Sequence, residues 1–541
     1  MDNNAKELLK QGDKLFKREG LLSLWQEIAL NFYPERADFT VTRNMGDTFA
    51  DHLLTSYPLL ARRDLGNSFS SMLRRDDWFH IKTKNETDNE GKAWMEWATG
   101  VQKKAMYDRI ARFERATKEG DHDFAAFGQC VITTELNRDR SALLYRSWHL
   151  RDVAWCENVE GEIDTVHQKW KPTARQLVQM FPGRCHPKIV DRAQKDPYAE
   201  IDCRRVVIAS SLYDTEYAGA PKNRGRFPFV SLYLDVVNQH VMEEMPLMFN
   251  PYVIPRWQTV SGSQYAFSPA TVAALPDARL IQAMMLTLLD AGEKASNPPM
   301  LAVGDAIRSD IDLRAGGITW VDSEYDERLG EVLRPLSIDS KGFPLGFELM
   351  SGIREMIGEA FFLNKLTLPM QAGDMTATEV SQRVQEYIRQ ALPLFEPMEK
   401  NYNAALCENT FNILMSAGVF GSDIPDSLRG QDVDFKFESP LHMAVELEKG
   451  TKLGNAVQLT MATMQLDPGA SSNLDVGIAL RDALEGIGVP QRWIRDEQQA
   501  AQIADAMAQQ QAKQAQIQQA QAAGEAGQAL GGAAESMGVN Q

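Results

Sequence analysis

Residues 268–299 read SPATVAALPDARLIQAMMLTLLDAGEKASNPP and form the most distinctive stretch of the chain. Ser268 is a typical helix N-cap, and Pro269 suits the first helical position. The double proline at 298–299 stops the helix at about residue 296. Twenty-nine residues in a helix would span about 43 Å. Pro276 predicts a kink or a delayed start.

The residues after this helix predict a β-like excursion and a returning helix. Residues 297–345 contain short β-like runs separated by turn residues. A second helix is predicted over residues 346–362, and a loop containing Pro369 and Gly373 over residues 364–375. Proline or glycine therefore marks the steps between these segments.

A further long helix is predicted to begin at Thr376, which has the capping-box spacing to Glu379. It would reach Ala417, with kinks at Pro393 and Pro397.

The first half of the chain mixes helices and strands. Apolar residues recur at helical spacing over three stretches, residues 5–33, 50–75 and 93–118. Short β-rich runs bounded by Gly, Pro and Asp then predict strands, most clearly at residues 130–134, 206–209 and 229–233. The fold class expected for the whole chain is α+β, mainly helical.

The C-terminal part predicts helices without strands. Residues 450–494 indicate a small helical module. Of the 31 residues from 498 to 528, 23 are Ala or Gln, which gives high helix propensity but hardly any apolar stripe. Such a helix is stable only when neighbours pack against it. The last dozen residues are predicted to be disordered.

The composition is that of a globular protein with an acidic surface. The 541 residues carry a formal net charge of −17, which argues against a surface that grips nucleic acid everywhere. Five cysteines without a CxxC pair predict neither disulfides nor a zinc site, and favour reduced thiols in the cytoplasm. We expect no signal peptide, and no transmembrane helix because the apolar run 280–289 is too short.

No catalytic motif is present in the sequence. It contains no GxxxxGK[ST] loop, no HExxH, no GxSxG and no GxGxxG after a strand. The chain is therefore expected not to be an enzyme, and neither a cofactor nor a metal is predicted.

Two groups of residues have the side-chain types of metal ligands. Asp121, His122 and Asp123 cannot share one helix face, so a solvated loop or helix cap is the favoured interpretation. His149 with Asp152 is a similarly weak metal pair.

The arginine pairs at 62–63 and 74–75 suggest either a nucleic-acid patch or, preferably, ion pairs with the acidic residues that follow. Trp78 and Phe79 are predicted to be core residues rather than a base-stacking platform.

An ordered set of short motifs resembles the portal proteins, the head-to-tail connectors of short-tailed bacteriophages. The motifs are Arg256-Trp257, Gly262-Ser263-Gln264-Tyr265, Ser268-Pro269, Leu275-Pro276-Asp277, Asn297-Pro298-Pro299 and Met375-Thr376-Ala377-Thr378-Glu379-Val380. The helix around residues 65–73 and the Trp78-Phe79 step are also similar. The family typically has tyrosine-glycine before Ser-Pro, where this chain has Ala266-Phe267. The resemblance covers roughly residues 5–495.

The resemblance implies a portal-type protomer with wing, stem, clip and crown that assembles into a ring. Its segments would be an α+β wing (1–265), a first stem helix (266–296), a clip (297–345), a second stem helix (346–363), a tunnel loop (364–375), a long kinked helix with the remaining wing (376–449), a crown (450–494) and an Ala/Gln-rich C-terminal helix, barrel-like with a disordered end (495–541).

The implied function is a channel at one capsid vertex, through which double-stranded DNA is packaged and ejected without sequence specificity. The implied partners are further copies of the chain, usually twelve, the terminase large subunit, major capsid and scaffold proteins, and a tail adaptor or tube protein, with no membrane. The protein would be assembled in the host bacterial cytoplasm and end up in the virion. Twelve copies at −17 each would carry a formal charge near −204, which suits a weakly adhesive channel wall.

Candidate functional residues follow from these segments. The residues expected at the DNA channel are Lys365, Thr367, Gln371 and Asp374, and Lys365 has the alternative of a solvated loop lysine. The residues expected at the motor or adaptor interface are Asp322, Glu324, Asp326, Glu327 and Arg328. These acidic clip residues have two alternatives, a cation site, for which the spacing of a calcium loop is missing, and a charged edge that discourages aggregation.

Two other functions remain as alternatives. A scaffold or tail protein is one, although a scaffold would have fewer strands in its first half. A DNA-processing enzyme is the other, and the missing motifs count against it. The helix–β–helix order over residues 268–363 favours the portal interpretation.

Overall fold

A computed structural model describes most of the chain up to residue 437 and short pieces beyond it. The described residues are 2–363 except 45, 49, 75–77, 84–88, 218–226, 303–306, 308–309, 312–319, 321–332 and 336–341; 398–437 except 422 and 431; and 454, 456–460, 476–486, 489, 493, 502–503, 506–507 and 509–514. They divide into two compact units: residues 1–79, 100–421 and 437–441, and residues 80–99, 422–436 and 442–541.

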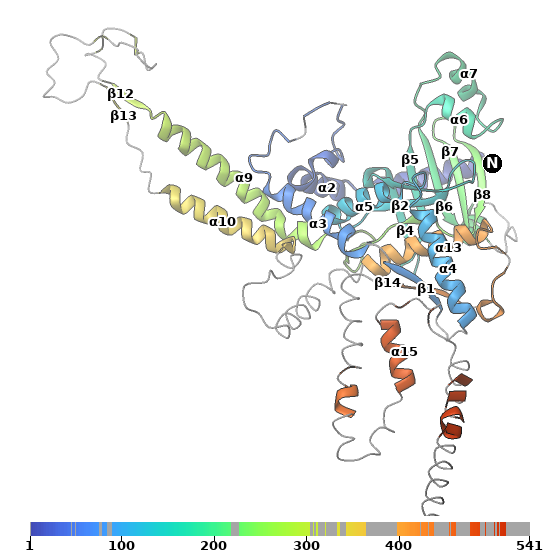
Figure 1. The fold of residues 1–541 in the computed structure, drawn as a ribbon. Helices are drawn as coiled ribbons and strands as arrows, with labels where there is room; N and C mark the ends of the chain where they lie inside the picture. Colours follow the sequence, from blue (N-terminus) through green and yellow to red (C-terminus); the bar gives the residue numbers. More distant parts are fainter. Residues whose placement is uncertain are drawn as a thin grey trace, which may run out of the picture. The chain divides into compact units, whose positions relative to one another are not determined.

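The described residues form a mixed arrangement of helices and strands (Figure 1). The helices are α1 (Asp2–Phe16), α2 (Glu19–Phe32), α3 (Tyr57–Leu73), α4 (Asn89–Met106), α5 (Phe113–Phe127), α6 (Ala174–Met180), α7 (Pro187–Lys195), α8 (Ser210–Glu216), α9 (Pro269–Ser296), α10 (Gly342–Ala360), α13 (Ala404–Ser416) and α15 (Val476–Gly486). The strands are β1 (Phe79–Thr83), β2 (Val131–Leu136), β3 (Leu143–Trp148), β4 (Val153–Glu157), β5 (Ile163–Trp170), β6 (Cys203–Ala209), β7 (Phe229–Asp235), β8 (His240–Leu247), β9 (Tyr252–Val253), β10 (Gln258–Thr259), β11 (Ala266–Phe267), β12 (Met300–Ala302), β13 (Leu333–Pro335) and β14 (Val433–Phe437).

The largest sheet of the first unit has the antiparallel order β4-β5-β6-β7-β8. Val206 pairs with Leu232 and Ile208 with Val230, so alternate residues of β6 and β7 place these four apolar side chains on one face. The buried face of α1 covers them, and together they form one hydrophobic cluster. In β7, Val230, Leu232 and Leu234 alternate with Ser231 and Tyr233, and this alternation matches the covered face of the sheet.

A second sheet, of order β3-β2-β9, lies against the opposite side through polar contacts. Arg205 on β6 pairs with Glu135 on β2. Tyr252 on β9 donates a hydrogen bond to Gln168 on β5. These side chains cross-link the two sheets, because each buried polar group requires a partner.

The strands predicted from the sequence are confirmed, since β6 and β7 contain the runs 206–209 and 229–233 and β2 contains all of the run 130–134 except Cys130. Two of the predicted helical stretches are each two helices. The stretch 5–33 breaks between α1 and α2, where the Arg18 guanidinium donates to the carbonyls of Leu150 (2.6 Å) and Val153 (2.7 Å). The stretch 93–118 breaks before α5, where Arg112 has a φ of 57°.

The Asp121-His122-Asp123 run is neither a solvated loop nor a helix cap, and that prediction is wrong. These residues lie within α5, where Asp121 and Asp123 are both buried. Asp121 pairs with the buried Arg74, and Asp123 lies 3.1 Å from the guanidinium of Arg36. The two carboxylates leave the helix in different directions and neutralise different arginines, so they hold α5 in place.

The prediction for the arginine pairs is partly confirmed. Exposed Arg63 pairs locally with Asp64 at 3.4 Å. Arg62 is instead buried and donates to the carbonyl of Phe32 (3.1 Å), while Arg74 reaches Asp121. Trp78 and Phe79 are fully buried, as predicted.

We expect Asp121→Asn to lower the free energy of unfolding by about 3–5 kcal/mol, because it leaves the buried Arg74 charge without its counter-charge. Chemical denaturation at a fixed protein concentration measures this loss. The control is Asp64→Asn, which breaks an exposed pair and should cost less than about 1 kcal/mol. Equal losses in the two variants would show that the buried pair has no special role.

Candidate functional site: the helix pair α9–α10

Helix α9 begins and ends where the sequence predicts. Ser268 is its N-cap, and the Ser268 hydroxyl accepts from the Thr271 amide. The same hydroxyl donates to the carbonyl of Ala125 (2.7 Å), and the Thr271 hydroxyl donates to that of Ala126 (2.8 Å). The start of α9 is thus attached to the end of α5. The helix continues through Pro276, so the start is not delayed.

Gly128 brings the end of α5 against the residue that precedes α9. Its φ is +72°, and a Cβ atom built there would lie 2.1 Å from the carbonyl carbon of Phe267. Its amide donates to Phe124 and closes α5, while its carbonyl accepts from Trp257. Only glycine fits this backbone conformation and this close approach.

Residues from the first part of the chain hold the next part of α9. The Gln282 side chain accepts from the amides of Leu54 (2.8 Å) and Thr55 (3.1 Å) and donates to the carbonyl of Thr55 (3.0 Å). Arg279 donates to Glu27 through Nε at 2.6 Å. Beyond Gln282, no described residue of α9 is buried. The distal half of the helix therefore leaves the core.

Helix α10 packs along α9 and confirms the predicted second helix, although it begins a few residues earlier. Met350, Ile353 and Ile357 form its buried face. A Cβ atom at Gly346 would lie 2.8 Å from Leu288 of α9, so this glycine permits close contact between the helices. Figure 1 shows the pair extending together from the region of α2 and α3 to β12 and β13.

A two-stranded antiparallel ribbon closes the far end of the pair. Met300 of β12 pairs with Pro335 of β13, and Ala302 pairs with Leu333. The segment between the two helices thus leaves and returns through adjacent strands, in agreement with its predicted β-like character.

Two stripes on α10 face solvent in the isolated chain. An apolar stripe consists of Leu345, Leu349 and Met356, which are 59%, 53% and 48% exposed. An acidic stripe consists of Glu348, Glu355 and Glu359, all exposed. At about 100° per residue, the two stripes lie side by side, and the acidic one is opposite the buried face. We name them the apolar stripe and the acidic stripe.

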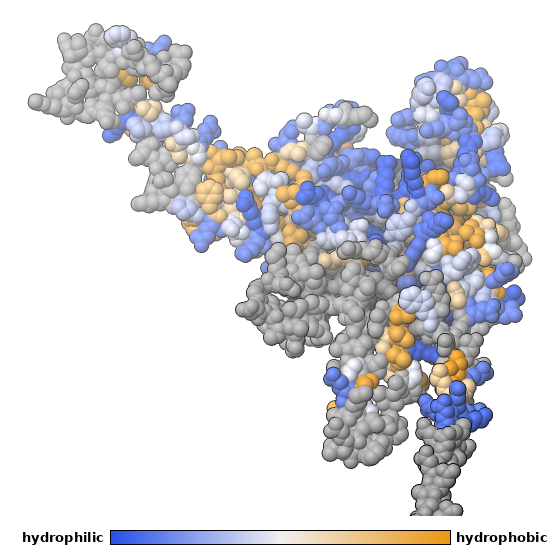
Figure 2. Space-filling view, in the orientation of Figure 1, coloured by the Kyte–Doolittle hydropathy of each residue, from blue (hydrophilic) through white to orange (hydrophobic). Residues whose placement is uncertain are grey.

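The apolar character of this region extends to α9. Val272, Leu280, Leu286 and Leu289 are about half exposed. Figure 2 shows hydrophobic side chains gathered over the helix pair. An exposed apolar surface of this kind marks a contact with a partner.

The length and composition of α9 would also allow it to cross a membrane, contrary to the sequence-based prediction. Its most apolar 18-residue window has a mean hydropathy of 1.4, and 22% of that window is buried. The prediction considered only uninterrupted apolar runs, whereas the mean hydropathy of an 18-residue window can be high even when a few of its residues are polar. A single helix of this kind is weak evidence for a membrane, because interior helices pass the same test.

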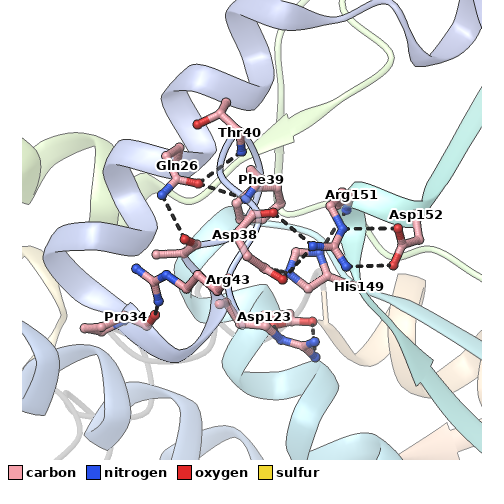
Figure 3. A network of polar contacts seen from close by, with 12 residues as sticks. Gln26, Pro34, Asp38, Phe39, Thr40, Arg43, Asp123, His149, Arg151 and Asp152 are labelled. Carbon is pink, nitrogen blue, oxygen red and sulfur yellow. Dashed lines mark hydrogen bonds and ion pairs between the residues drawn. The ribbon is translucent and has the colours of Figure 1, made fainter. Parts of the chain in front are cut away.

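The His149–Asp152 pair belongs to a structural network rather than to a metal site (Figure 3). His149 Nε2 lies 2.7 Å from Asp38, and Asp152 pairs with Arg151. Burial alone would raise the pKa of Asp38, but His149 and Arg151 outweigh it and lower that pKa.

The same network holds the loop that follows α2. Gln26 donates to the carbonyl of Ala37 (2.9 Å) and accepts from the amide of Phe39 (2.8 Å). Within the described part of the chain, no three His, Cys, Asp or Glu side chains are grouped to hold a metal.

The site residues predicted from the sequence cannot be placed. The channel residues Lys365, Thr367, Gln371 and Asp374 and the clip residues Asp322, Glu324, Asp326, Glu327 and Arg328 lie outside the described residues. The kinks predicted at Pro393 and Pro397 also lie outside them. The end of that helix is confirmed, because α13 stops at Ser416 with Ala417 as its C-cap.

Neither stripe of α10 was predicted, although the spacing of both is present in the sequence. Glu348 and Glu355 are seven residues apart, as are Leu349 and Met356, and this spacing returns a helix to nearly the same face. The sequence alone does not show which face of α10 the rest of the protein leaves uncovered.

The family model described as bacteriophage head to tail connecting protein matches residues 5–494. This chain belongs to that family. It is therefore a connector between the head and the tail of a phage, and a structural component of the phage particle. The match supports the leading prediction over a scaffold, a separate tail protein or an enzyme.

Named relatives agree with the family. The chain is 24% identical over 451 residues to the "Probable portal protein" of Bordetella phage BPP-1, covering 81% of this chain and 79% of the relative. It is 23% identical over 371 residues to the "Portal protein" of Salmonella phage epsilon15, covering 65% of each.

Similar solved structures include chains from "Virion of native gene transfer agent (GTA) particle" and "Neck of empty GTA particle computed with C6 symmetry". Their TM-scores are 0.34 and 0.33, with 8% and 9% identity. The first match covers 74% of this chain and 85% of the other, and the second covers 81% and 90%. A likeness at this level carries no argument about function.

We expect Gly128→Ala to destabilise the protein by at least ~2 kcal/mol more than Gly183→Ala. Both glycines have a φ of +72°, so both variants incur the same backbone cost of roughly 1–2 kcal/mol. Only Gly128 has the Phe267 backbone in the way, whereas nothing lies near Gly183. Thermal or chemical unfolding compares the two, and equal losses would contradict the anchoring role of Gly128.

Proposed function

We propose that copies of this chain form a closed ring at one vertex of the capsid, with the α9–α10 pair as the stem that lines a DNA channel. The observation that supports this most directly is the pair of adjacent stripes on α10. A monomer gains nothing from an exposed row of Leu345, Leu349 and Met356. A ring buries such a row against the neighbouring copy.

The two stripes would serve different surfaces of the ring. In a cyclic assembly each copy presents one side to its neighbour and another to the central space. The apolar stripe would face the neighbouring copy, where the exposed leucines of α9 offer complementary apolar surface. The acidic stripe, beside it and opposite the buried face, would then point into the channel.

An acidic channel wall suits the passage of DNA. DNA-binding affinity comes mainly from cations that neutralise phosphates, so a wall lined with carboxylates does not retain the duplex. Helices α9 and α10 together carry six acidic and three basic side chains, and Arg279 is already paired with Glu27. DNA of any sequence would therefore slide past without stalling.

The remaining segments are assigned by the family likeness. Residues 297–345 would be the clip, and Asp322, Glu324, Asp326, Glu327 and Arg328 would meet the terminase large subunit and later the tail adaptor. Residues 364–375 would be the tunnel loop, with Lys365, Thr367, Gln371 and Asp374 next to DNA. Residues 450–494 would be the crown, and 495–541 would extend it as a helical barrel.

The other regions would follow the same plan. Residues 1–265 and part of 376–449 would form the wing, which faces the major capsid and scaffold proteins. The ring would assemble in the host cytoplasm before the head fills. Motor activity would come from the terminase, because the connector role requires no turnover by this chain.

We expect the purified chain to form a species near 727 kDa, which is twelve times 60.6 kDa. The triple variant Leu345→Ser/Leu349→Ser/Met356→Ser should shift most of it toward the monomer mass, because the interface between copies loses its apolar surface. Native mass spectrometry or light scattering measures the shift.

The control for this experiment is Val159→Ser/Met180→Ser/Val237→Ser, which removes three exposed apolar side chains from the sheet region. It should leave the assembly intact. A ring that persists in the α10 variant would refute the assignment of the apolar stripe. If the parent protein is also a monomer, the chain does not form a ring unaided.

We expect Glu348→Lys/Glu355→Lys/Glu359→Lys to preserve the ring but to bind linear duplex DNA at least ~tenfold more tightly, because three cations replace three anions on the channel wall. Fluorescence anisotropy with a labelled linear duplex measures this gain. The matched charge reversal Asp139→Lys/Glu160→Lys/Glu162→Lys lies on exposed loops outside the stem. If both variants gain equally, the acidic stripe does not line the channel.

A further inference from the structure

Helix α7 carries a row of cations on one face. Lys188, Arg192 and Lys195 are spaced i, i+4 and i+7, so they project from the same side of the helix. All three are exposed, and none has an ion pair among the described residues. We name these three residues the basic stripe.

Another face of α7 is fixed to the sheet. Ile189 is buried and belongs to a cluster with Leu177 of α6 and Cys203 of β6. The N-cap His186 accepts from the amide of Lys188 at 3.3 Å. Helix α6 is in turn capped at its N-terminus by a capping box between Thr173 and Gln176. The basic stripe is therefore presented by a packed scaffold and not by a loose loop.

The charge around the stripe differs from that of the chain as a whole. Residues 171–195 contain six basic and one acidic residue, within a chain of net charge −17. Lys171 is paired with Asp202 and Arg184 with Glu243. The exposed Arg175 adds a fourth cation without an ion pair among the described residues. Figure 2 shows a hydrophilic surface where α7 lies.

We infer that the basic stripe binds the phosphate backbone of duplex DNA on the outside of the protein, away from the proposed channel. Three residues spread over seven positions span about 10 Å of helix axis. Each DNA strand carries one phosphate per roughly 3.4 Å of its axis, so three cations can each neutralise one phosphate. The interaction would be independent of sequence, since no base edge is read.

Two observations favour duplex DNA over other polyanions. Lysine is depleted from protein–protein interfaces, whereas two of the three stripe residues are lysines. The stripe contains no aromatic side chain on which the bases of a single strand could stack. An acidic protein surface is the competing partner, and the experiment below distinguishes it.

The test uses the full-length protein and a relaxed, covalently closed circular duplex. A closed circle has no end to thread through a ring, so it reports only binding to the outside. Lys188→Gln/Arg192→Gln/Lys195→Gln should weaken binding at least ~tenfold at low salt. It should also reduce the slope of log affinity against log salt by about 2.7, or 0.9 for each phosphate that is no longer neutralised.

The matched control is Lys6→Gln/Lys10→Gln/Lys14→Gln on α1. It removes the same charge from three exposed positions at helical spacing, but acidic residues alternate with them at Asp2, Glu7 and Asp13. Its binding should change less than ~twofold, because α1 has no excess of cations. The double variant Lys188→Arg/Lys195→Arg keeps the charge and should keep parent affinity.

Two results would overturn the inference. Equal weakening by the α1 and α7 variants would mean that only the total charge matters. If the α7 variant binds the circle as tightly as the parent does but no longer binds a poly-glutamate peptide, the stripe is a site for an acidic protein. Neither result would alter the mass of the ring, so failure here is separate from failure of the proposed function.

Discussion

The close approach of Phe267 to Gly128 is the constraint on which the helix pair depends. It places the end of α5 directly beneath the start of α9, where two hydroxyls bond to the last carbonyls of α5. Because α5 is itself held by two ion pairs at Asp121 and Asp123, the anchor is rigid at its base. The first residues of α9 therefore fix where the helix starts, and the contacts of Arg279 and Gln282 hold its next part.

This arrangement separates a part of the chain that is buried in the core from a part that stays exposed. The sheets and the helices α1, α2, α3 and α5 bury most of the large apolar and aromatic side chains. The distal half of α9 and the outer face of α10 keep leucines exposed beside a row of glutamates. In the ring proposed above, the buried part would anchor the helix pair and the exposed part would contact neighbouring copies of the chain. The basic stripe on α7 adds a local exception to an acidic protein.

The sequence-based interpretation failed where polar residues were taken one element at a time. Asp121 and Asp123 resembled a solvated run because their partners, Arg74 and Arg36, are distant in the chain. Arg62 and Arg74 were paired with neighbouring acids for the same reason, although both are buried. Spacing along the sequence carries no information about a partner that tertiary packing brings close. Removing one member of a buried pair is costly, because the other charge is left buried without a partner.

The sequence by itself determined the elements whose signals are local. Ser268 with Pro269 and the prolines after Asn297 delimit α9, and short β-rich runs bounded by Gly, Pro and Asp predict β2, β6 and β7. The ordered motifs were sufficient to identify the family. Only the tertiary structure decided which helix faces remain uncovered, because exposure depends on what packs against each face. The stripes on α10 and α7 became visible in this way, since identical spacing in the sequence can describe a buried face or an exposed one.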